Sequence, residues 1–424
     1  MEMEELLHYA WKHKIFPLKE LFTTRGEPVE IIDPGLLNPN AGPDFFNAKL
    51  RIGETMWVGN VEIHRRSSDW VRHGHHTDPA YESVVLHVAA DVDAEVADCK
   101  GRNVPQMCMP CPEWLEERYE ELCRADCYPP CYSVVSSLPV FAVHSWMAAL
   151  QYERMEQKRC RVMDCVESCG RNWEDAFFVT LARNFGFGLN SEVFERWGKS
   201  IPLRAVDKHR DDLFQVEAIF FGQAGLLDEE EGDDYYLRMR KEYLYLAHKF
   251  ELKRPTASGW RFLRTRPGNF PHVRIAQIAW LFYHEHALLS RLLEAEDAVA
   301  ARGMLAARTS SYWETHYAFG TESPKRKKEL SIATRDLLVI NTVCPFLFAY
   351  GKYKSNEEMA GRAFAILEKL KPENNYIVRQ WQQCGLKVEN AADSQALIQL
   401  RKEYCDVKKC LYCRFGYAYL KREG

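Results

Sequence analysis

The spacing of apolar residues along the chain changes near residue 135. Before this point, apolar residues alternate with polar ones or form short β-branched runs, as in strands. The expected strands are Val29–Ile32, Phe45–Ile52, Met56–His64 and Ser83–Ala89. Helical spacing flanks them at Glu4–Phe22, where Pro17 opens a second short helix, and at Glu113–Leu122.

After residue 135, apolar residues recur every three or four positions over long stretches, which is typical of packed helices. The expected helices are Val143–Met163, Trp173–Phe185, Phe214–Leu226, Tyr235–Phe250, Val273–Ala295, Leu330–Tyr350 and Glu357–Lys369. We therefore predict an α+β protein. A mixed α/β domain occupies residues 1–135, and a larger all-helical domain occupies residues 136–424.

Composition narrows the classes of partner and compartment. The 424 residues are 46% apolar, which is enough for the cores of two or three domains. A formal charge of −4 gives no global attraction to nucleic acid or to an anionic membrane, so such a partner must be bound locally. No apolar run reaches the roughly 18 residues of a membrane span, and MEMEELLHYAWKHKIF fits neither a signal peptide nor a transit peptide. We expect a cytoplasmic protein.

The predicted hairpin carries the residues best suited to catalysis. Hydrolysis of a phosphodiester requires carboxylates that hold a magnesium ion, which activates water and neutralises charge on the phosphate. Asp44 and Glu62 can supply these carboxylates. Residues two apart on a strand share a face, so His64 projects beside Glu62 and can orient the water or bind the phosphate.

The register of the hairpin decides whether these groups meet. A two-residue turn without a bulge places Asp44 and Glu62 on opposite faces. A bulge at Gly59, or a three-residue loop, shifts the pairing by one residue. Asp44 then opposes His64, Glu62 opposes Phe46, and the polar groups converge. The predicted phosphodiester-hydrolysing site therefore depends on this shift.

This order of features resembles the PD-(D/E)XK nuclease superfamily. Pro43-Asp44 matches the first half of its motif, and Glu62-Ile63-His64 matches the second, with histidine in place of the usual lysine. A neutral imidazole would act there as a base or ligand. The resemblance implies a nuclease that uses magnesium or manganese, with Asp44, Glu62 and His64 as catalytic residues. It also implies a glutamate on the first helix, for which Glu5 and Glu20 are candidates, or Glu30 on the first strand.

Over much of its length the chain is similar to an uncharacterised bacterial family, domain of unknown function 2851. The segments that carry this similarity are LNPNAGPDFFNA, GNVEIHRRSSDW, HHTDPAYESVVLHV, EAIFFGQAGLL and RPGNFPHVRIAQ. The family brings no established activity. The similarity implies that the polar residues of the hairpin belong to the family pattern.

A histidine-rich loop follows the hairpin. It contains His73, His75, His76 and Asp78, and His87 lies in the next apolar strand. One hypothesis is a zinc or manganese site made by His64, a loop histidine, Asp78 and His87. The alternative is a solvated polar loop with one hydrogen-bonded core histidine.

Three cysteines near the C-terminus have the spacing of a metal site. Cys405, Cys410 and Cys413 form C-x4-C-x2-C, and a fourth ligand would complete a zinc site or an iron–sulfur cluster. The candidates for the fourth ligand are Cys131, Cys344 and Cys384, of which Cys384 is nearest in sequence. Reduced thiols without a metal are the alternative. A second zinc hypothesis uses Cys108, Cys111, Cys123, Cys127 and Cys131.

One basic and aromatic stretch suits phosphate contact and base stacking. Its candidate substrate-binding residues are Arg261, Arg264, Arg266 and Arg274. Together these patterns favour a metal-dependent nuclease, or a phosphodiesterase derived from one, that acts on nucleic acid. Two alternatives stay open: a non-catalytic nucleic-acid-binding or scaffold protein, and a histidine-metal hydrolase of small molecules.

Overall fold

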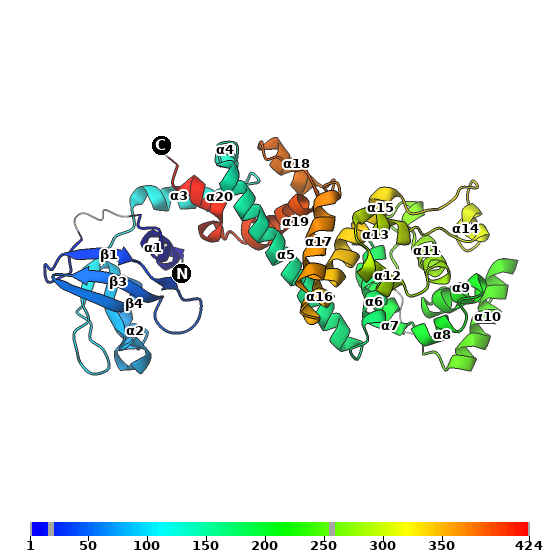
Figure 1. Ribbon diagram of the computed structural model, residues 1–424, viewed down its shortest axis with the longest axis horizontal. Coiled ribbons are helices and arrows are strands. Elements are labelled where there is room, and N and C mark those ends of the chain that lie inside the picture. Colours follow the sequence, from blue (N-terminus) through cyan, green and yellow to red (C-terminus); the bar gives the residue numbers. More distant parts are fainter. Residues whose placement is uncertain (1, 16–20, 254–258, 423–424) are drawn as a thin grey trace. The chain divides into compact units, whose positions relative to one another are not determined.

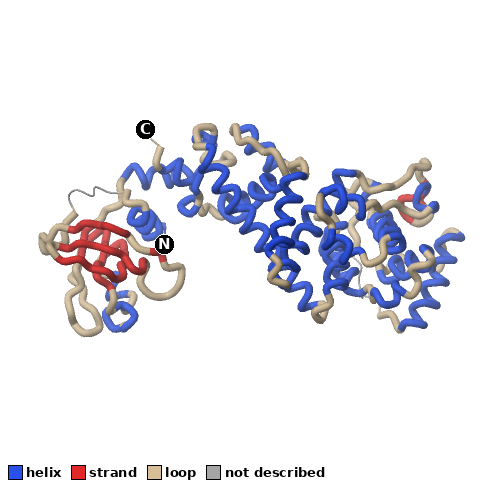
Figure 2. The backbone as a smooth tube through the Cα atoms, in the orientation of Figure 1, coloured by secondary structure: helices blue, strands red, loops and turns tan. Residues whose placement is uncertain are grey.

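The computed structural model describes residues 2–15, 21–253 and 259–422. The chain divides into two compact units (Figure 1). The first consists of residues 1–142 and 402–424, and the second of residues 143–401. The C-terminal residues 402–424, which we expected in the helical domain, therefore pack in the first unit. Strands gather in the first unit, and helices make up most of the second (Figure 2).

A mixed sheet forms the centre of the first unit. Its strands are β1 (Val29–Asp33), β2 (Leu36–Leu37), β3 (Phe45–Ile52), β4 (Thr55–Arg66), β5 (Val84–Asp91) and β6 (Gln106–Cys108). The order is β1-β3-β4-β5-β6, with β2 paired to β3. Pairs among β1 to β4 are antiparallel, whereas β4/β5 and β5/β6 are parallel. A parallel pair needs a crossover, and the β4–β5 crossover carries the histidine-rich loop.

Short helices complete the first unit. They are α1 (Glu2–Lys12), α2 (Asp69–Arg72), η1 (His75–Thr77), η2 (Pro79–Tyr81), α3 (Glu113–Arg124), α4 (Tyr132–Val135), η6 (Cys410–Tyr412) and α20 (Arg414–Leu420). Helix α1 packs against β4, and α20 packs against α3 and α4. A small core of Trp70, Tyr81, Val84, Val96 and Val104 fixes the crossover to the sheet.

The second unit is helical around one large core. Its first helices are α5 (Val140–Ser168, which begins in the first unit), α6 (Trp173–Phe185), α7 (Ser191–Ser200), α8 (Leu203–Asp207), α9 (Leu213–Gln223) and α10 (Asp234–Phe250). The middle helices are η3 (Pro267–Asn269), α11 (Pro271–His284), α12 (Leu288–Glu294), α13 (Ala298–Met304) and α14 (Ser311–Thr315). The last are α15 (Ile332–Leu338), the π-helical turn η4 (Val339–Val343), α16 (Cys344–Tyr353), α17 (Glu357–Lys369), α18 (Tyr376–Gln383) and α19 (Ala391–Leu400). The π-helical turn η5 (Arg401–Cys405) follows, and β7 (His316–Ala318) pairs with β8 (Thr321–Glu322).

The predicted α+β class and the predicted strands are confirmed. Two predicted helices are interrupted. Val273–Ala295 breaks into α11 and α12 near Ala287, which has φ 49°, and Leu330–Tyr350 contains the π turn. The helix predicted to open at Pro17 falls outside the described residues.

One described segment is long and apolar enough to span a membrane. It is Ile332–Tyr353, and 61% of its most apolar stretch is buried inside the protein. Core helices of soluble proteins have the same length and composition. The burial therefore supports a soluble protein.

Candidate metal centre

The predicted hairpin contains a bulge, which lies in β3. Ala48 pairs with Gly59, whereas Phe45 pairs with Val61, so β3 has one residue more than β4 between the two pairs. Asn47 lies in this bulge with φ 55°, in the left-handed region that asparagine tolerates better than most residues. Because of the bulge, side chains at the start of β3 point to the face of the sheet opposite to the one they would occupy in a regular strand.

The prediction of a bulge at Gly59 was therefore wrong. The shift occurs on the opposite strand and in the opposite direction, so Asp44 lies level with Glu62 instead of His64. Position 59 is occupied by glycine for a different structural reason. A Cβ atom at this position would lie 2.3 Å from Val85 Cγ1, so the close approach of β5 requires glycine.

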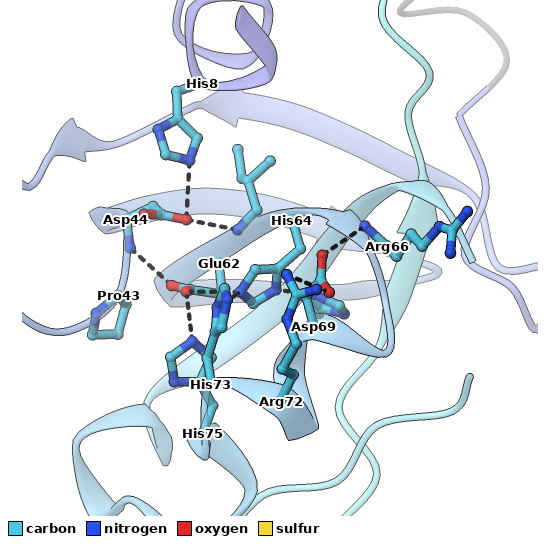
Figure 3. Close-up of polar contacts among 12 residues, drawn as sticks. His8, Pro43, Asp44, Glu62, His64, Arg66, Asp69, Arg72, His73 and His75 are labelled. Carbon is cyan, nitrogen blue, oxygen red and sulfur yellow. Dashed lines mark hydrogen bonds and ion pairs between the residues drawn. The ribbon is translucent and has the colours of Figure 1, made fainter. Parts of the chain in front are cut away.

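The shifted register brings Asp44 and Glu62 together (Figure 3). The backbone N–H of Asp44 donates to Glu62 Oε2 at 3.0 Å, and Asp44 Oδ2 accepts from the backbone N–H of Ile63 at 2.8 Å. Helix α1 contributes His8, whose Nε2 forms an ion pair with Asp44 Oδ2 at 3.2 Å. Each carboxylate is thus held by the backbone of the other strand.

Three histidines bring their ring nitrogens together, and two of them, His64 and His75, lie beside Glu62. His64 comes from β4, and His73 and His75 come from the crossover. One ligand atom from each of the three lies within 4.8 Å of the others, and His64 Nε2 is 3.2 Å from His73 Nδ1. Glu62 Oε1 lies 3.2 Å from His75 Nε2 and 3.5 Å from His64 Nε2. Figure 3 shows these side chains pointing toward one another.

Neighbouring aromatic groups fix the orientation of the imidazoles. His64 Nδ1 lies 2.9 Å from His87 Nε2, so an ion on His64 Nε2 would leave Nδ1–H to donate to His87. The ring of Tyr81 stacks on His75 with centroids 3.8 Å apart. Trp70 contacts the rings of His75 and His87 edge-on. The ligand rings are therefore positioned before any ion binds.

The buried groups carry little charge near neutral pH. Burial, with the neighbouring Asp44, raises the pKa of Glu62 far above its ordinary value. Burial and the neighbouring histidines lower the pKa of His64 to about 2, and burial lowers the pKa of His87 to about 3. Neutral imidazole is the form that binds metals, and a bound cation would displace the proton of Glu62.

The donor set fits a transition metal. Metal–nitrogen distances of about 2.0–2.1 Å place tetrahedral ligands roughly 3.3 Å apart, close to the separations of His64 from His73 (3.2 Å) and of Glu62 from His75 (3.2 Å) and His64 (3.5 Å). Imidazole nitrogens suit zinc, and a carboxylate such as Glu62 also suits manganese, whereas magnesium prefers an all-oxygen shell and retains water. Glu62, His64, His73 and His75 therefore fit zinc or manganese better than the expected magnesium.

The other predicted ligands lie outside this group. His87 is buried behind His64, and exposed Asp78 caps η2 by accepting from Ala80 N–H at 2.9 Å. Asp44 Oδ2 is engaged by Ile63 and His8. We expected one loop histidine among the ligands, whereas two loop histidines, His73 and His75, lie in the cluster.

The sequence analysis missed two residues of α1. His8 reaches Asp44, and Glu4, one turn earlier, lies close enough to interact electrostatically with His8 and Glu62. Burial alone would lower the pKa of His8, but the contact with Asp44 outweighs it and raises the pKa above its ordinary value. The i, i+4 spacing of an acid and a histidine was the signal in the sequence.

The glutamates that we considered as the additional carboxylate of a PD-(D/E)XK site lie elsewhere. Glu5 interacts electrostatically with Tyr119 and Tyr412, and Glu30 forms a surface ion pair with Arg51 at 2.7 Å. Glu20 lies outside the described residues.

Residues 4–376 match the family described as protein of unknown function (DUF2851). The chain belongs to DUF2851. The match includes the hairpin and all three clustered histidines, and it confirms the resemblance seen in the sequence. No curated protein and no solved structure matches the chain. The resemblance to PD-(D/E)XK nucleases stays a prediction.

The predicted substrate-binding arginines of the DUF2851 region differ in exposure. Arg261, Arg264 and Arg266 are exposed in the segment before α11. Arg274 is buried, and its guanidinium donates to Gln277 Oε1 at 2.8 Å and to Asn269 Oδ1 at 2.6 Å. The exposed three are therefore the group available to a partner.

The C-terminal cysteines follow the DUF2851 match and belong to the first unit. Cys410 and Cys413 are buried, and Cys131 is buried close enough to them and to Cys405 for the thiols to interact electrostatically. Burial and these neighbours raise the pKa of Cys131 well above its ordinary value. Cys384, the fourth ligand we expected from sequence, belongs to the second unit, and Cys344 is also there.

Proposed function

We propose that the first unit is a metal-dependent hydrolase that cleaves phosphodiester bonds in nucleic acid. The observation that carries this proposal is the convergence of Asp44 and Glu62 with His64, His73 and His75. The order of elements adds support: α1, β1, Pro43-Asp44 at the start of β3, the hairpin, and Glu62-Ile63-His64 on β4 follow the order of PD-(D/E)XK nucleases.

Each side chain has a distinct role in this proposal. Glu62, His64, His73 and His75 would hold zinc or manganese, with His73 at the exposed edge of the group. When bound, the ion supplies Lewis acid chemistry to the phosphate and the attacking water. Asp44 would orient that water and accept its proton, and His8 holds the carboxylate through their ion pair; both side chains are about one-fifth exposed. Arg261, Arg264 and Arg266, which belong to the second unit, are candidate phosphate contacts of a nucleic acid.

The decisive experiment is a cleavage assay with the full chain. Protein loaded with manganese or zinc should cleave single-stranded DNA, duplex DNA or RNA, and Glu62→Gln and Asp44→Asn should each lower the rate at least ~100-fold. His76→Ala is the matched control, because His76 is exposed in the same loop but lies outside the cluster. Full activity in both acidic variants would contradict the proposal.

A non-catalytic nucleic-acid-binding or scaffold protein is the second proposal. The burial of Glu62 and His64, which are 4% and 1% exposed, favours it, since structural metal sites are closed. Such a protein should bind nucleic acid in a salt-sensitive way without cleaving it, and should lose affinity in the Arg264→Ala/Arg266→Ala variant.

We also propose a thiolate metal site in the first unit, made by Cys131, Cys405, Cys410 and Cys413. Cys131 and Cys413 lie at the N-terminal ends of α4 and α20, two helices that pack against each other. Such a set suits zinc or an iron–sulfur cluster. A cytoplasmic location fits the cysteines, which are free of disulfides throughout the described chain.

A further inference from the structure

The second unit contains a cavity whose charged lining is mostly basic. Its volume is about 460 Å³, and it lies between α5, α6, α7 and the π turn η4. Valine and proline side chains form part of its wall, at Val162, Val179 and Pro345. The basic residues that line it are Arg154, Lys158, Arg161, Arg183 and Lys199, and the acidic ones are Asp164 and Glu195.

The lining acids do not neutralise this charge. Glu195 forms ion pairs with both Arg183 and Lys199. Arg161 is exposed and has no ion pair with any described residue, and Asp164 is then the remaining acid in the wall. An anion is the ligand that would balance these cations.

Arg154 forms the buried end of the cavity. Its Nε donates to Gln395 Oε1 at 3.4 Å, and Gln395 in turn donates to Glu373. The side chain is only 8% exposed, so its position is set by packing. Glu373 compensates part of the charge from behind the cavity wall.

Lys158 connects this cavity to the π turn. Its Nζ donates to Ile340 O at 3.2 Å and to Asn341 Oδ1 at 3.0 Å, which leaves one N–H of the ammonium group. Burial and the nearby Arg154 lower the pKa of Lys158 to about 7. Asn184 donates to Asn341 O at 2.9 Å and holds the other side of the turn. Single π turns in helices are frequent at functional sites.

We infer that this cavity binds a phosphate ester of nucleotide size, with Lys158 and Arg161 as its phosphate contacts. Small-molecule sites typically measure about 300–1,000 Å³ and combine apolar walls with a few convergent polar groups. This cavity has both features. Guanidinium and ammonium groups together are the usual phosphate ligands of proteins. The inference concerns the second unit alone and is independent of the proposed hydrolase.

Isothermal titration of the full chain tests this inference. The probes are ADP, inorganic pyrophosphate and a twelve-nucleotide single-stranded DNA. At least one should bind, and Arg161→Glu should weaken binding at least ~10-fold. Binding near pH 8 should also take up a proton, because the bound phosphate restores the charge of Lys158; two buffers of different ionisation enthalpy measure this uptake.

Arg171→Glu is the matched control, since Arg171 is exposed beyond the C-terminal end of α5 and does not line the cavity. It should bind like the unaltered chain. Preference for ADP would assign the site to a free nucleotide, and preference for the oligonucleotide would assign it to a nucleic-acid backbone; both support phosphate recognition. No binding of any probe, or equal losses in both variants, would overturn the inference. Lys158→Met repeats the test should Arg161→Glu fail to fold.

Discussion

Asp44 and Glu62 hold each other across the hairpin: the backbone N–H of Asp44 donates to Glu62 Oε2 at 3.0 Å. The carboxylate of Asp44 returns the contact by accepting from the N–H of Ile63, the next residue of β4. This reciprocal arrangement exists only because the bulge in β3 shifts the register by one residue. It also fixes Glu62 so that its other oxygen faces His64 and His75.

The first prediction concerns the histidine cluster. Removal of one ligand, in His75→Ala or His73→Ala, should lower zinc affinity at least ~10-fold, since even the loss of a partner behind a ligand costs about 10–100-fold. His87→Ala, which removes such a partner, should fall in that range. Metal analysis after dialysis against a competing chelator measures the effect.

His76→Ala should retain zinc, because His76 lies in the same loop but outside the cluster. Equal zinc content in His75→Ala and His76→Ala would show that the three histidines do not form a metal site.

The second prediction concerns Asn47. Its φ of 55° strains β-branched residues, so Asn47→Val should lower the free energy of unfolding by about 1–2 kcal/mol, whereas Asn47→Gly should be close to neutral. If the bulge positions the acids, Asn47→Val should also weaken zinc binding. Urea unfolding and zinc titration measure the two effects; unchanged zinc affinity in a destabilised Asn47→Val protein would separate the bulge from the site.

Much of the fold follows from apolar spacing, but the site depends on one irregularity of that spacing. Phe45, Ala48, Leu50 and Ile52 are the buried positions of β3. The gap of three between Phe45 and Ala48 breaks the period of two, which is the sequence signature of the bulge. We predicted the bulge at Gly59 instead, because glycine within a strand marks either a bulge or a close approach of another strand. Local sequence does not distinguish these two cases.

Other parts of the site could not be predicted from spacing at all. His73 and His75 meet His64 because the core around Trp70 and Tyr81 folds the crossover onto the sheet. That geometry depends on tertiary packing. The same holds for Cys131, which is far from the C-terminal cysteines in sequence and reaches them through the contact of α4 with α20.

The third prediction concerns the cysteines. The purified chain should contain zinc or an iron–sulfur cluster bound to thiolates, and Cys131→Ser should lose it to the same extent as Cys410→Ser. Cys160→Ser should retain it, because Cys160 is exposed on α5. Metal analysis and the visible absorption spectrum measure the result. Full metal content in Cys131→Ser together with a loss in Cys384→Ser would assign the fourth ligand to Cys384 instead.

The fourth prediction concerns Glu217, which is fully buried in α9. Burial raises its pKa to about 7, although Tyr235 OH donates to its Oε2 at 2.6 Å. Between about pH 4.5 and 7 the folded protein keeps this proton, whereas the unfolded chain releases it, so the unfolded state binds fewer protons and stability falls as pH rises. The total change is roughly 3 kcal/mol.

Glu217→Gln should remove this contribution and keep a neutral hydrogen-bonding group in the core. The difference in the free energy of unfolding between the two proteins should therefore change in favour of the glutamine variant as pH rises from 5 to 7. Urea unfolding at several pH values measures this difference, with Glu230→Gln, on the exposed loop after α9, as the control. Parallel profiles for all three proteins would mean that Glu217 titrates at its ordinary pKa.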